Sequence, residues 1–532
     1  MRSRQCRLTL VVLLLHLHDS LKRADAHPGH HEAHGAQHRP TSGLLVMSFD
    51  GFRPDYLSRL RDAIAQNATE TNHFDRLIAH GVHAPNGIEN VFTTKTFPNH
   101  YTLVTGLYEE SHGIVANSFW DPQTNRTVAY PNSAADARYY GGEPIWQTYG
   151  QQRDRSKVAC LAWVGCGLPI NNYSLPAVIR YHSNITCDEH IDALESWILA
   201  GVQLTLLYFH EPDATGHAFG PNAPEILSML LKLNECLGRV LAKLESLGVW
   251  PHGTDIVLLS DHGMESLTRT VILPRNDQLY RIVVLDYIIA MIDPLPGKTA
   301  EALASLRAID GVQVYEKSEL PDHWHWRDND RIRQISVVAN SGVALSEANE
   351  NTMKGGHGFD TSDSRMLPMF IAAGESFQTG KQITEPMQFR SVDVYLLMCT
   401  LLGVAPAPNN GSLQRVASIV RGERMHQQHR ERSMQLSRHS VDHFVVVSSC
   451  FFVVTIAVMV VLLHFLSTHI RKSTQTKFQR LTLTEQSQRL LNRPGDFDDL
   501  TSEDESVDEF LSVAVEQSMR PRIHWQTQQQ LR

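Results

Sequence analysis

One group of residues in this sequence combines carboxylates with imidazoles and contains no cysteine. It has six members in four short segments: Asp50, Asp213, His217, Asp261, His262 and His357. Carboxylate and imidazole are the ligand types of catalytic zinc and of other borderline divalent ions. The segment "KGGHGFD" places glycines on both sides of His357, which lets the backbone approach such a site closely. These residues predict a divalent metal site.

A threonine can complete the chemistry of that site. Thr96 lies in "TKTFPNHY", next to a Phe97-Pro98 step that favours extended or turn geometry. We therefore expect a strand end that runs into a tight loop and then a helix. Three carboxylates leave two zinc ions one negative charge short of balance, and a deprotonated threonine would supply it. Since metal coordination activates a hydroxyl, Thr96 is predicted to be both metal ligand and nucleophile.

The elements that must position these residues follow from the apolar pattern. Short apolar runs predict strands buried on both faces at residues 44–49, 203–209, 255–260 and 369–374. Between the second and third runs, a helical pattern from Ile226 to Leu244 predicts an amphipathic helix, capped by Asn222 and stopped by Gly248. This alternation indicates an open, mostly parallel α/β sheet with helices on both faces. Ligands gather at the carboxyl ends of such strands, so the metal-binding residues can converge there.

Two apolar segments outside the sheet predict the compartment. Residues 1–26 combine early arginines, an apolar run and a small-residue end, as a secretory signal peptide does. Residues 444–466 contain no charged side chain and are long enough to form one C-terminal transmembrane helix. We expect a single-pass type I protein of the cell membrane with its catalytic domain extracellular. Five glycosylation sequons lie on the side that would be translocated: Asn67, Asn125, Asn172, Asn184 and Asn410.

The expected organisation has six parts: signal peptide 1–26, His-rich linker 27–41, catalytic domain 42–413, basic stalk 414–443, transmembrane helix 444–466 and acidic cytoplasmic tail 467–532. The His-rich linker is either a solvated segment or a capture site for zinc or copper. Five cysteines lie outside the signal and the span, which permits at most two disulfides and leaves one thiol, with the connectivity open. The net charge of -9 makes nucleic-acid polymers poor partners.

Several motifs together resemble the ecto-nucleotide pyrophosphatase/phosphodiesterase family, within the alkaline-phosphatase-like superfamily. They are "TKTFPNHY", "VTGLYEESHGIVAN", "EPDATGH", "SDHGM", "HGFD" and "PAPNNGSL". The signal peptide, single catalytic domain and C-terminal span resemble the type I membrane members, the fourth and fifth of the mammalian series. The resemblance extends from about Gly43 to Leu413 and implies an alkaline-phosphatase-like fold.

The resemblance also implies a role for each site residue. One zinc ion would be held by Asp213, His217 and His357, and a second by Asp50, Thr96, Asp261 and His262. Thr96 would attack phosphorus and form a threonyl-nucleotide intermediate, which water then hydrolyses. Asn117 would donate to a non-bridging oxygen of the transition state. Phe97 and Tyr181 would enclose the base.

The expected activity is zinc-dependent hydrolysis of phosphodiester or pyrophosphate bonds in nucleotides or dinucleotide polyphosphates. Two alternatives remain open at this point: a choline-phospholipid phosphodiesterase and a catalytically silent cell-surface receptor. The segment "LAWVGCGLPIN" lacks the Trp-Pro-Gly usual for the family, which leaves the details of the substrate pocket open. A sulfatase is disfavoured because the sequence contains no Cys-x-Pro-x-Arg site.

Overall fold

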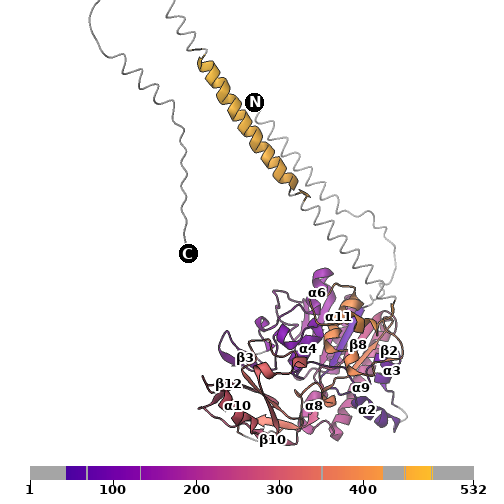
Figure 1. Ribbon diagram of the computed structural model, residues 1–532. Helices are drawn as coiled ribbons and strands as arrows, with labels where there is room; N and C mark the ends of the chain where they lie inside the picture. The colour runs from indigo at the N-terminus through magenta and orange to yellow at the C-terminus, as the bar shows by residue number, and fades with distance from the viewer. Residues whose placement is uncertain are drawn as a thin grey trace, which may run out of the picture. The chain divides into compact units, whose positions relative to one another are not determined.

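A computed structural model describes residues 43–66, 70–131, 134–348, 352–422, 448–449, 451–480 and 482. The predicted signal peptide, the His-rich linker and most of the predicted stalk and tail lie outside the described residues, as does the sequon at Asn67. The chain divides into two units, Met1–Ser437 and Arg438–Arg532. The first unit contains the sheet and the candidate site (Figure 1).

The first unit is built on an eight-stranded sheet. Its strand order is β18 (Lys381–Gln382), β2 (Gly81–His83), β17 (Phe370–Ala373), β8 (Thr254–Leu259), β1 (Gly43–Phe49), β7 (Leu204–Phe209), β5 (Val158–Leu161) and β6 (Ala177–Ile179). The predicted strands correspond to β1, β7, β8 and β17. All neighbours pair in parallel except β17, which runs antiparallel to β2 and β8. The open, mostly parallel α/β fold is therefore confirmed, with one reversed strand.

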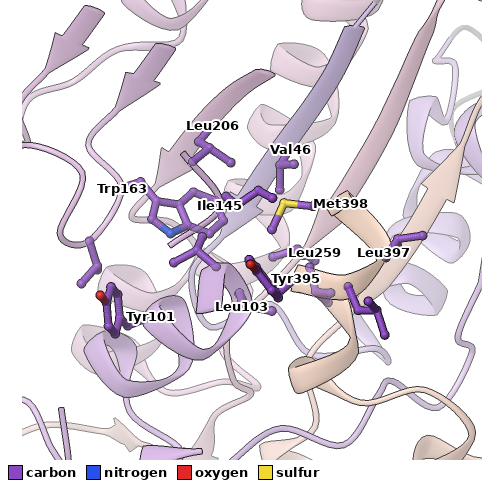
Figure 2. Packing of buried hydrophobic residues seen from close by; sticks show 14 of the residues in the cluster. Val46, Tyr101, Leu103, Ile145, Trp163, Leu206, Leu259, Tyr395, Leu397 and Met398 are labelled. Atoms are coloured by element: carbon purple, nitrogen blue, oxygen red, sulfur yellow. The ribbon is translucent and has the colours of Figure 1, made fainter. Parts of the chain in front are cut away.

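Alternating side chains of β1 show why helices must cover both faces of the sheet. Leu44 and Val46 belong to one buried cluster, whereas Leu45, Met47 and Phe49 belong to another. The first cluster is covered by α4 (Thr96–Thr105), α6 (Ile145–Gln152) and α11 (Ser391–Leu402). In Figure 2, Val46 and Leu206 of the sheet lie beside Trp163, Ile145 and Met398.

The opposite face is covered by α2 (Tyr56–Ala65), α3 (His73–Ile78), α7 (Cys187–Leu199) and α9 (Pro224–Ser246). Helix α9 buries the predicted apolar positions from Ile226 to Leu244. The prediction that Asn222 caps this helix is wrong. Ala223 is the cap residue and Pro224 takes the first helical position, where a missing N–H costs nothing. Gly248 follows the helix end in a left-handed conformation, as its predicted role requires.

A second, smaller sheet was not predicted from the sequence. It is antiparallel and contains β11 (Tyr280–Leu285), β12 (Ile289–Pro294), β14 (Ile335–Ala339) and β13 (Val312–Glu316), with α10 (Thr299–Arg307) packed against it. We call residues 267–348 the small subdomain. It also includes β10 (Arg269–Ile272), which pairs with β15 (Val343–Ser346). Figure 1 shows α10, β10 and β12 grouped at one end of the unit.

Shorter elements complete the unit. They are α5 (Glu109–His112), β3 (Phe119–Asp121) with β4 (Arg126–Val128), α8 (Asp213–Phe219), β9 (Glu265–Ser266) with β16 (Gly355–Gly356), and α12 (Leu413–Ala417). Val416, Ile419 and Val420 are buried in the main core, so the folded part continues past the expected boundary at Leu413. The basic residues around them had concealed this short apolar pattern.

In the second unit, one helix is long and apolar enough to cross a membrane. It spans Phe451–Arg480 and its apolar side chains are exposed in the described structure. This helix contains most of the predicted span 444–466 and continues beyond it into a basic segment. Its length and composition are consistent with a single-pass membrane anchor.

Candidate active site

The three aspartates of the predicted set converge at one edge of the main sheet. β1 lies between β7 and β8 and is parallel to both, so the chain leaves all three strands at the same edge. Asp50 follows β1 directly, Asp261 follows β8, and Asp213 begins α8 after β7. The backbone N–H of Asp213 donates to the Asp50 carbonyl at 3.0 Å, and Gly51 N–H donates to Asp261 Oδ1 at 3.2 Å.

The three histidines present the same ring nitrogen to these carboxylates. In each ring Nδ1 lies next to a backbone carbonyl: Gly355 for His217 (2.9 Å), Gly263 for His262 (2.9 Å) and Thr94 for His357 (2.8 Å). A hydrogen bond from Nδ1–H orients the ring and leaves Nε2 as the metal-binding atom. His262 Nε2 lies 3.3 Å from Asp50 Oδ1, and His217 Nε2 lies 3.3 Å from Asp213 Oδ2.

These residues form two adjoining groups with the composition of metal sites. One contains Asp213, His262 and His357, and the other contains Asp50, Asp261 and His262. His217 joins the first group, because its Nε2 lies 3.2 Å from His357 Nε2. His262 lies between the groups and stacks on His357 with ring centroids 3.5 Å apart. The structure therefore brings together all six predicted Asp and His residues.

Two observations test whether this cluster fits a pair of cations. One oxygen of each aspartate is buried without a well-formed hydrogen bond and lies near histidine ring nitrogens instead: Asp50 Oδ1, Asp213 Oδ1 and Asp261 Oδ2. Burial raises the pKa of Asp50 well above its ordinary value, and the neighbouring carboxylates of Asp261 and Asp213 raise it further. Buried carboxylates this close repel one another unless positive charge lies between them. The cluster therefore fits a bimetal centre.

Thr96 adjoins the same cluster. Its Oγ1 lies 3.3 Å from His262 Nε2. The prediction of a strand end and loop around Thr96 is wrong, because Thr96 is the first residue of α4 and residues 97–100 form its first turn. Pro98 is tolerated there since N–H groups in the first turn need no intrahelical partner. The N-terminal, positively polarised end of α4 thus lies beside the metal cluster, and a helix start of this kind can bind an anion.

A pocket of about 430 Å³ opens beside Thr96. Its lining includes Thr96, Phe97, Asn117 and Tyr181, so the structure places all the predicted substrate-contacting residues on one cavity. The Phe97 N–H donates to Asn117 Oδ1 at 3.0 Å, which holds the amide next to the helix start. Tyr130 also lines the pocket and lies 5.2 Å from Phe97 between ring centroids. An aromatic wall of this kind suits a flat base.

One wall of the pocket is a loop closed by a disulfide. Cys160 in β5 is bonded to Cys166, and residues 162–168 between and beyond them line the cavity. A second disulfide joins Cys187 of α7 to Cys236 of α9, and Cys399 is a buried free thiol. Two disulfides and one thiol agree with the count expected from the sequence. This pocket-wall loop lies in the segment "LAWVGCGLPIN", for which the sequence had left the pocket details open.

Sequence reasoning missed two residues that support the cluster, His100 and Tyr208. His100 lies within 3.2 Å of Asp261 Oδ2 and 2.9 Å of the Thr96 carbonyl, and the Tyr208 hydroxyl donates to Asp50 Oδ2. The i,i+4 spacing of Thr96 and His100 on one helix was a signal that could have identified His100. Tyr208 lies in an apolar strand, where a tyrosine carries no such signal.

An open α/β sheet with a buried Asp/His cluster and a helix-start threonine at its strand ends has the parts of a metal-dependent hydrolase. Comparison with known proteins identifies which class of hydrolase it is. A family model described as type I phosphodiesterase / nucleotide pyrophosphatase matches residues 44–360. The chain belongs to this family, as its motifs had indicated.

Individual relatives cover most of the same region. The bis(5'-adenosyl)-triphosphatase of Pongo abelii is 35% identical over 384 residues, which are 71% of this chain and 81% of the relative. Human ectonucleotide pyrophosphatase/phosphodiesterase family member 5 is 31% identical over 386 residues, covering 71% and 78%. The solved structure of murine ectonucleotide pyrophosphatase/phosphodiesterase 5 matches with a TM-score of 0.65 and 32% identity, covering 71% of this chain and 100% of that one.

Proposed function

We propose that this chain is a zinc-dependent nucleotide pyrophosphatase/phosphodiesterase that acts on nucleotides or dinucleotide polyphosphates outside the cell. The observation that carries the proposal is the position of Thr96. Its hydroxyl lies beside His262 of the metal cluster and also lines the aromatic pocket. The Thr96 hydroxyl would then be close to the metal ions that activate it and also to a nucleotide whose base occupies the aromatic pocket.

In the proposed reaction the Thr96 hydroxyl loses its proton to solvent, and its oxygen forms a bond to phosphorus as the bond to the leaving oxygen breaks. Two zinc ions held by the Asp and His residues would supply positive charge for the hydroxyl oxygen and the phosphoryl oxygens. The Asn117 side-chain oxygen accepts the Phe97 N–H at the start of α4, and its amide nitrogen would donate to a non-bridging oxygen of the transition state. Water then cleaves the threonyl-nucleotide ester, which releases the nucleoside monophosphate and restores the hydroxyl.

The substrate class is tested by removing the aromatic wall next to the nucleophile. Base stacking on an aromatic side chain is worth roughly 1–3 kcal/mol in single-stranded nucleic-acid sites. Phe97→Ala should therefore raise KM for a nucleotide substrate by about 10-fold, while an aryl phosphodiester without a base should lose less. The backbone bond from Phe97 to Asn117 does not depend on the ring, so it survives in the variant.

The assay uses the zinc-loaded full-length chain with a diadenosine triphosphate, nucleoside triphosphates, an aryl phosphodiester and lysophosphatidylcholine. Preferential cleavage of lysophosphatidylcholine by the wild type would favour the lipid phosphodiesterase. If Phe97→Ala raised KM equally for the nucleotide and for the aryl ester, that result would contradict a base-binding site at this wall. Wild-type protein that contains its metals but cleaves no substrate in the panel would favour a silent receptor.

The disulfide in the pocket wall should matter for substrate binding. Replacing Cys160 and Cys166 by serine is expected to raise KM for the nucleotide several-fold with a smaller change in kcat, because the wall loses its covalent tie. The matched control replaces Cys187 and Cys236. In the chain-entropy picture that longer loop contributes roughly 4 kcal/mol to stability and the pocket loop roughly 2 kcal/mol. The control should lower the melting temperature more and yet leave KM unchanged; the reverse pattern would refute the role of the wall.

We also infer that the chain is a type I membrane glycoprotein with its catalytic domain extracellular. Four of the sequon asparagines are exposed in the described structure: Asn125, Asn172, Asn184 and Asn410. Glycosidase treatment should therefore lower the apparent mass of protein from cells. An antibody against residues 503–509 should stain permeabilised cells only. Staining of intact cells would show that the tail is extracellular and would contradict the proposed topology.

A further inference from the structure

A buried lysine directly precedes the nucleophile. Lys95 is the residue before α4, and 1% of its side chain is exposed, although lysine is seldom buried without a partner. Its Nζ forms an ion pair with Asp286 Oδ1 at 2.7 Å and lies 3.6 Å from the centroid of the Tyr287 ring. Lys95 does not line the substrate pocket. Its ammonium group is therefore buried in the protein and paired there with Asp286.

Both partners of Lys95 come from the small subdomain. Asp286 and Tyr287 lie in the turn between β11 and β12, where the Asp286 N–H donates to the Ile289 carbonyl at 2.8 Å. The Asp286 side chain is 9% exposed, so the ion pair is buried on both sides. Removing either partner of a buried ion pair leaves the other charge uncompensated, which is strongly destabilising. The folded protein therefore keeps the two side chains paired.

The same turn also touches the histidines of the metal cluster. The Tyr287 ring centroid lies 5.8 Å from that of His217 and 6.1 Å from that of His357. The His357 N–H approaches the Tyr287 hydroxyl oxygen at 3.4 Å. One turn of the small subdomain thus contacts both the residue before the nucleophile and two of the metal-binding rings.

A glycine makes room for the lysine stem. A Cβ at Gly358 would lie 2.5 Å from Lys95 Cε, and the φ of Gly358 is +117°, which few other residues adopt. The segment before Thr96 is fastened there as well, because Gly358 N–H donates to Thr94 Oγ1 at 2.8 Å and Thr94 Oγ1 donates to the Phe359 carbonyl at 2.9 Å. The backbone on the N-terminal side of Thr96 is therefore held by the Lys95–Asp286 ion pair and by the hydrogen bonds of Thr94 to residues 358 and 359.

We propose that Lys95 is a positioning residue, and that its ion pair with Asp286 lets the small subdomain hold the Thr96 hydroxyl in line with the metal cluster. This inference rests on the proposed function, because it assigns Thr96 the role of nucleophile. It also gives the small subdomain a task in the reaction, although none of its residues lines the described pocket.

The test uses Asp286→Asn in the full-length chain. Displacing a reacting atom by about 1 Å can cost about 100-fold in rate, and loss of a supporting partner around a metal site typically costs 10- to 100-fold. We therefore expect kcat to fall about 10- to 100-fold, with KM for the nucleotide within about two-fold of wild type. Asp286→Glu keeps the carboxylate and should recover part of the loss. The double variant Lys95→Met/Asp286→Asn should be no worse than Lys95→Met, since the two side chains act as one unit.

The matched control is Asp293→Asn. It removes another ion pair of the same sheet, in which Arg333 Nε lies 2.9 Å from Asp293 Oδ1, away from the site. This control should keep wild-type kcat. An equal loss of kcat in both variants would show that only the integrity of the sheet matters, and would overturn the inference. Unchanged kcat in Asp286→Asn would overturn it too.

Two further measurements separate this inference from the proposed function. Metal analysis should find the same metal content in Asp286→Asn and wild type. Loss of metal would show that the Lys95–Asp286 pair supports the metal ligands, and would overturn its proposed role in positioning Thr96. A crystal structure of Asp286→Asn should show Thr96 Oγ1 displaced from its position 3.3 Å from His262 Nε2. That displacement is measurable even if the wild type hydrolyses no phosphodiester. In that case the proposed function would be wrong, while the inference that the ion pair positions Thr96 would still hold.

Discussion

Thr96→Ala is expected to lower turnover by more than about a thousand-fold while the protein folds and keeps its metals. Removing a nucleophile that acts together with its activating groups forfeits nearly the whole benefit of those groups, as hydrolase variants show. The six Asp and His residues of the cluster are untouched by this change. Thr96 Oγ1 makes one polar contact there, with His262 Nε2. The lost methyl and hydroxyl should therefore cost little stability.

The matched variant is Thr96→Ser, which keeps a hydroxyl at the same position. It should retain measurable turnover, reduced by the extra rotational freedom of an unbranched side chain. Acid quenching during turnover of a labelled nucleotide should trap label on the wild type and on Thr96→Ser, and none on Thr96→Ala. Turnover of Thr96→Ala at the wild-type rate would exclude the assignment of the nucleophile.

The part of the site that could be predicted is the part encoded by local pattern. A buried parallel strand is an apolar run, and an aspartate just after the run marks its carboxyl end. Asp50 and Asp261 were found in this way, and parallel pairing of β1 with β8 brought them together. His262 and His217 came with them, because each lies within four residues of an aspartate.

The direction of β17 could not be predicted, because an apolar run has no direction. The segment before β17 carries His357 at the carboxyl edge of the sheet, so the chain enters β17 from that edge and runs antiparallel to β8. The small subdomain was missed for a different reason. Strand β12 pairs with β14, whose residues lie more than 40 positions further along the chain, and its strands are interrupted by helices and turns.

Contacts between distant segments were equally hidden. Lys95 stands in a conspicuous motif, but its partner Asp286 is one acidic residue among many in the sequence. The pairing of Cys160 with Cys166 was also open, because five cysteines permit several arrangements. In each case the side chain was visible in the sequence, and the element that carries its partner was not.

Metal removal should abolish activity, and zinc should restore it. Three buried carboxylate oxygens without well-formed hydrogen bonds face the cluster, so its geometry is expected to depend on cations. Chelation is expected to remove two equivalents of zinc per chain and to lower the melting temperature, since a ligand bound only by the folded state stabilises it. Dialysis against zinc should return both activity and stability.

Single substitutions should show that each of the two groups of Asp and His residues binds one equivalent of zinc. His357→Ala should weaken one metal site and Asp261→Ala the other, each leaving about one equivalent of zinc. The control is His112→Gln, because His112 is also fully buried but contacts Thr102 and the Ile114 N–H, outside the cluster. This control should keep both equivalents whatever it costs in stability. Fully active wild-type protein without bound divalent metal would contradict a metal mechanism. A zinc content that fell equally in His112→Gln and His357→Ala would show that folding, and not ligation, sets the metal content.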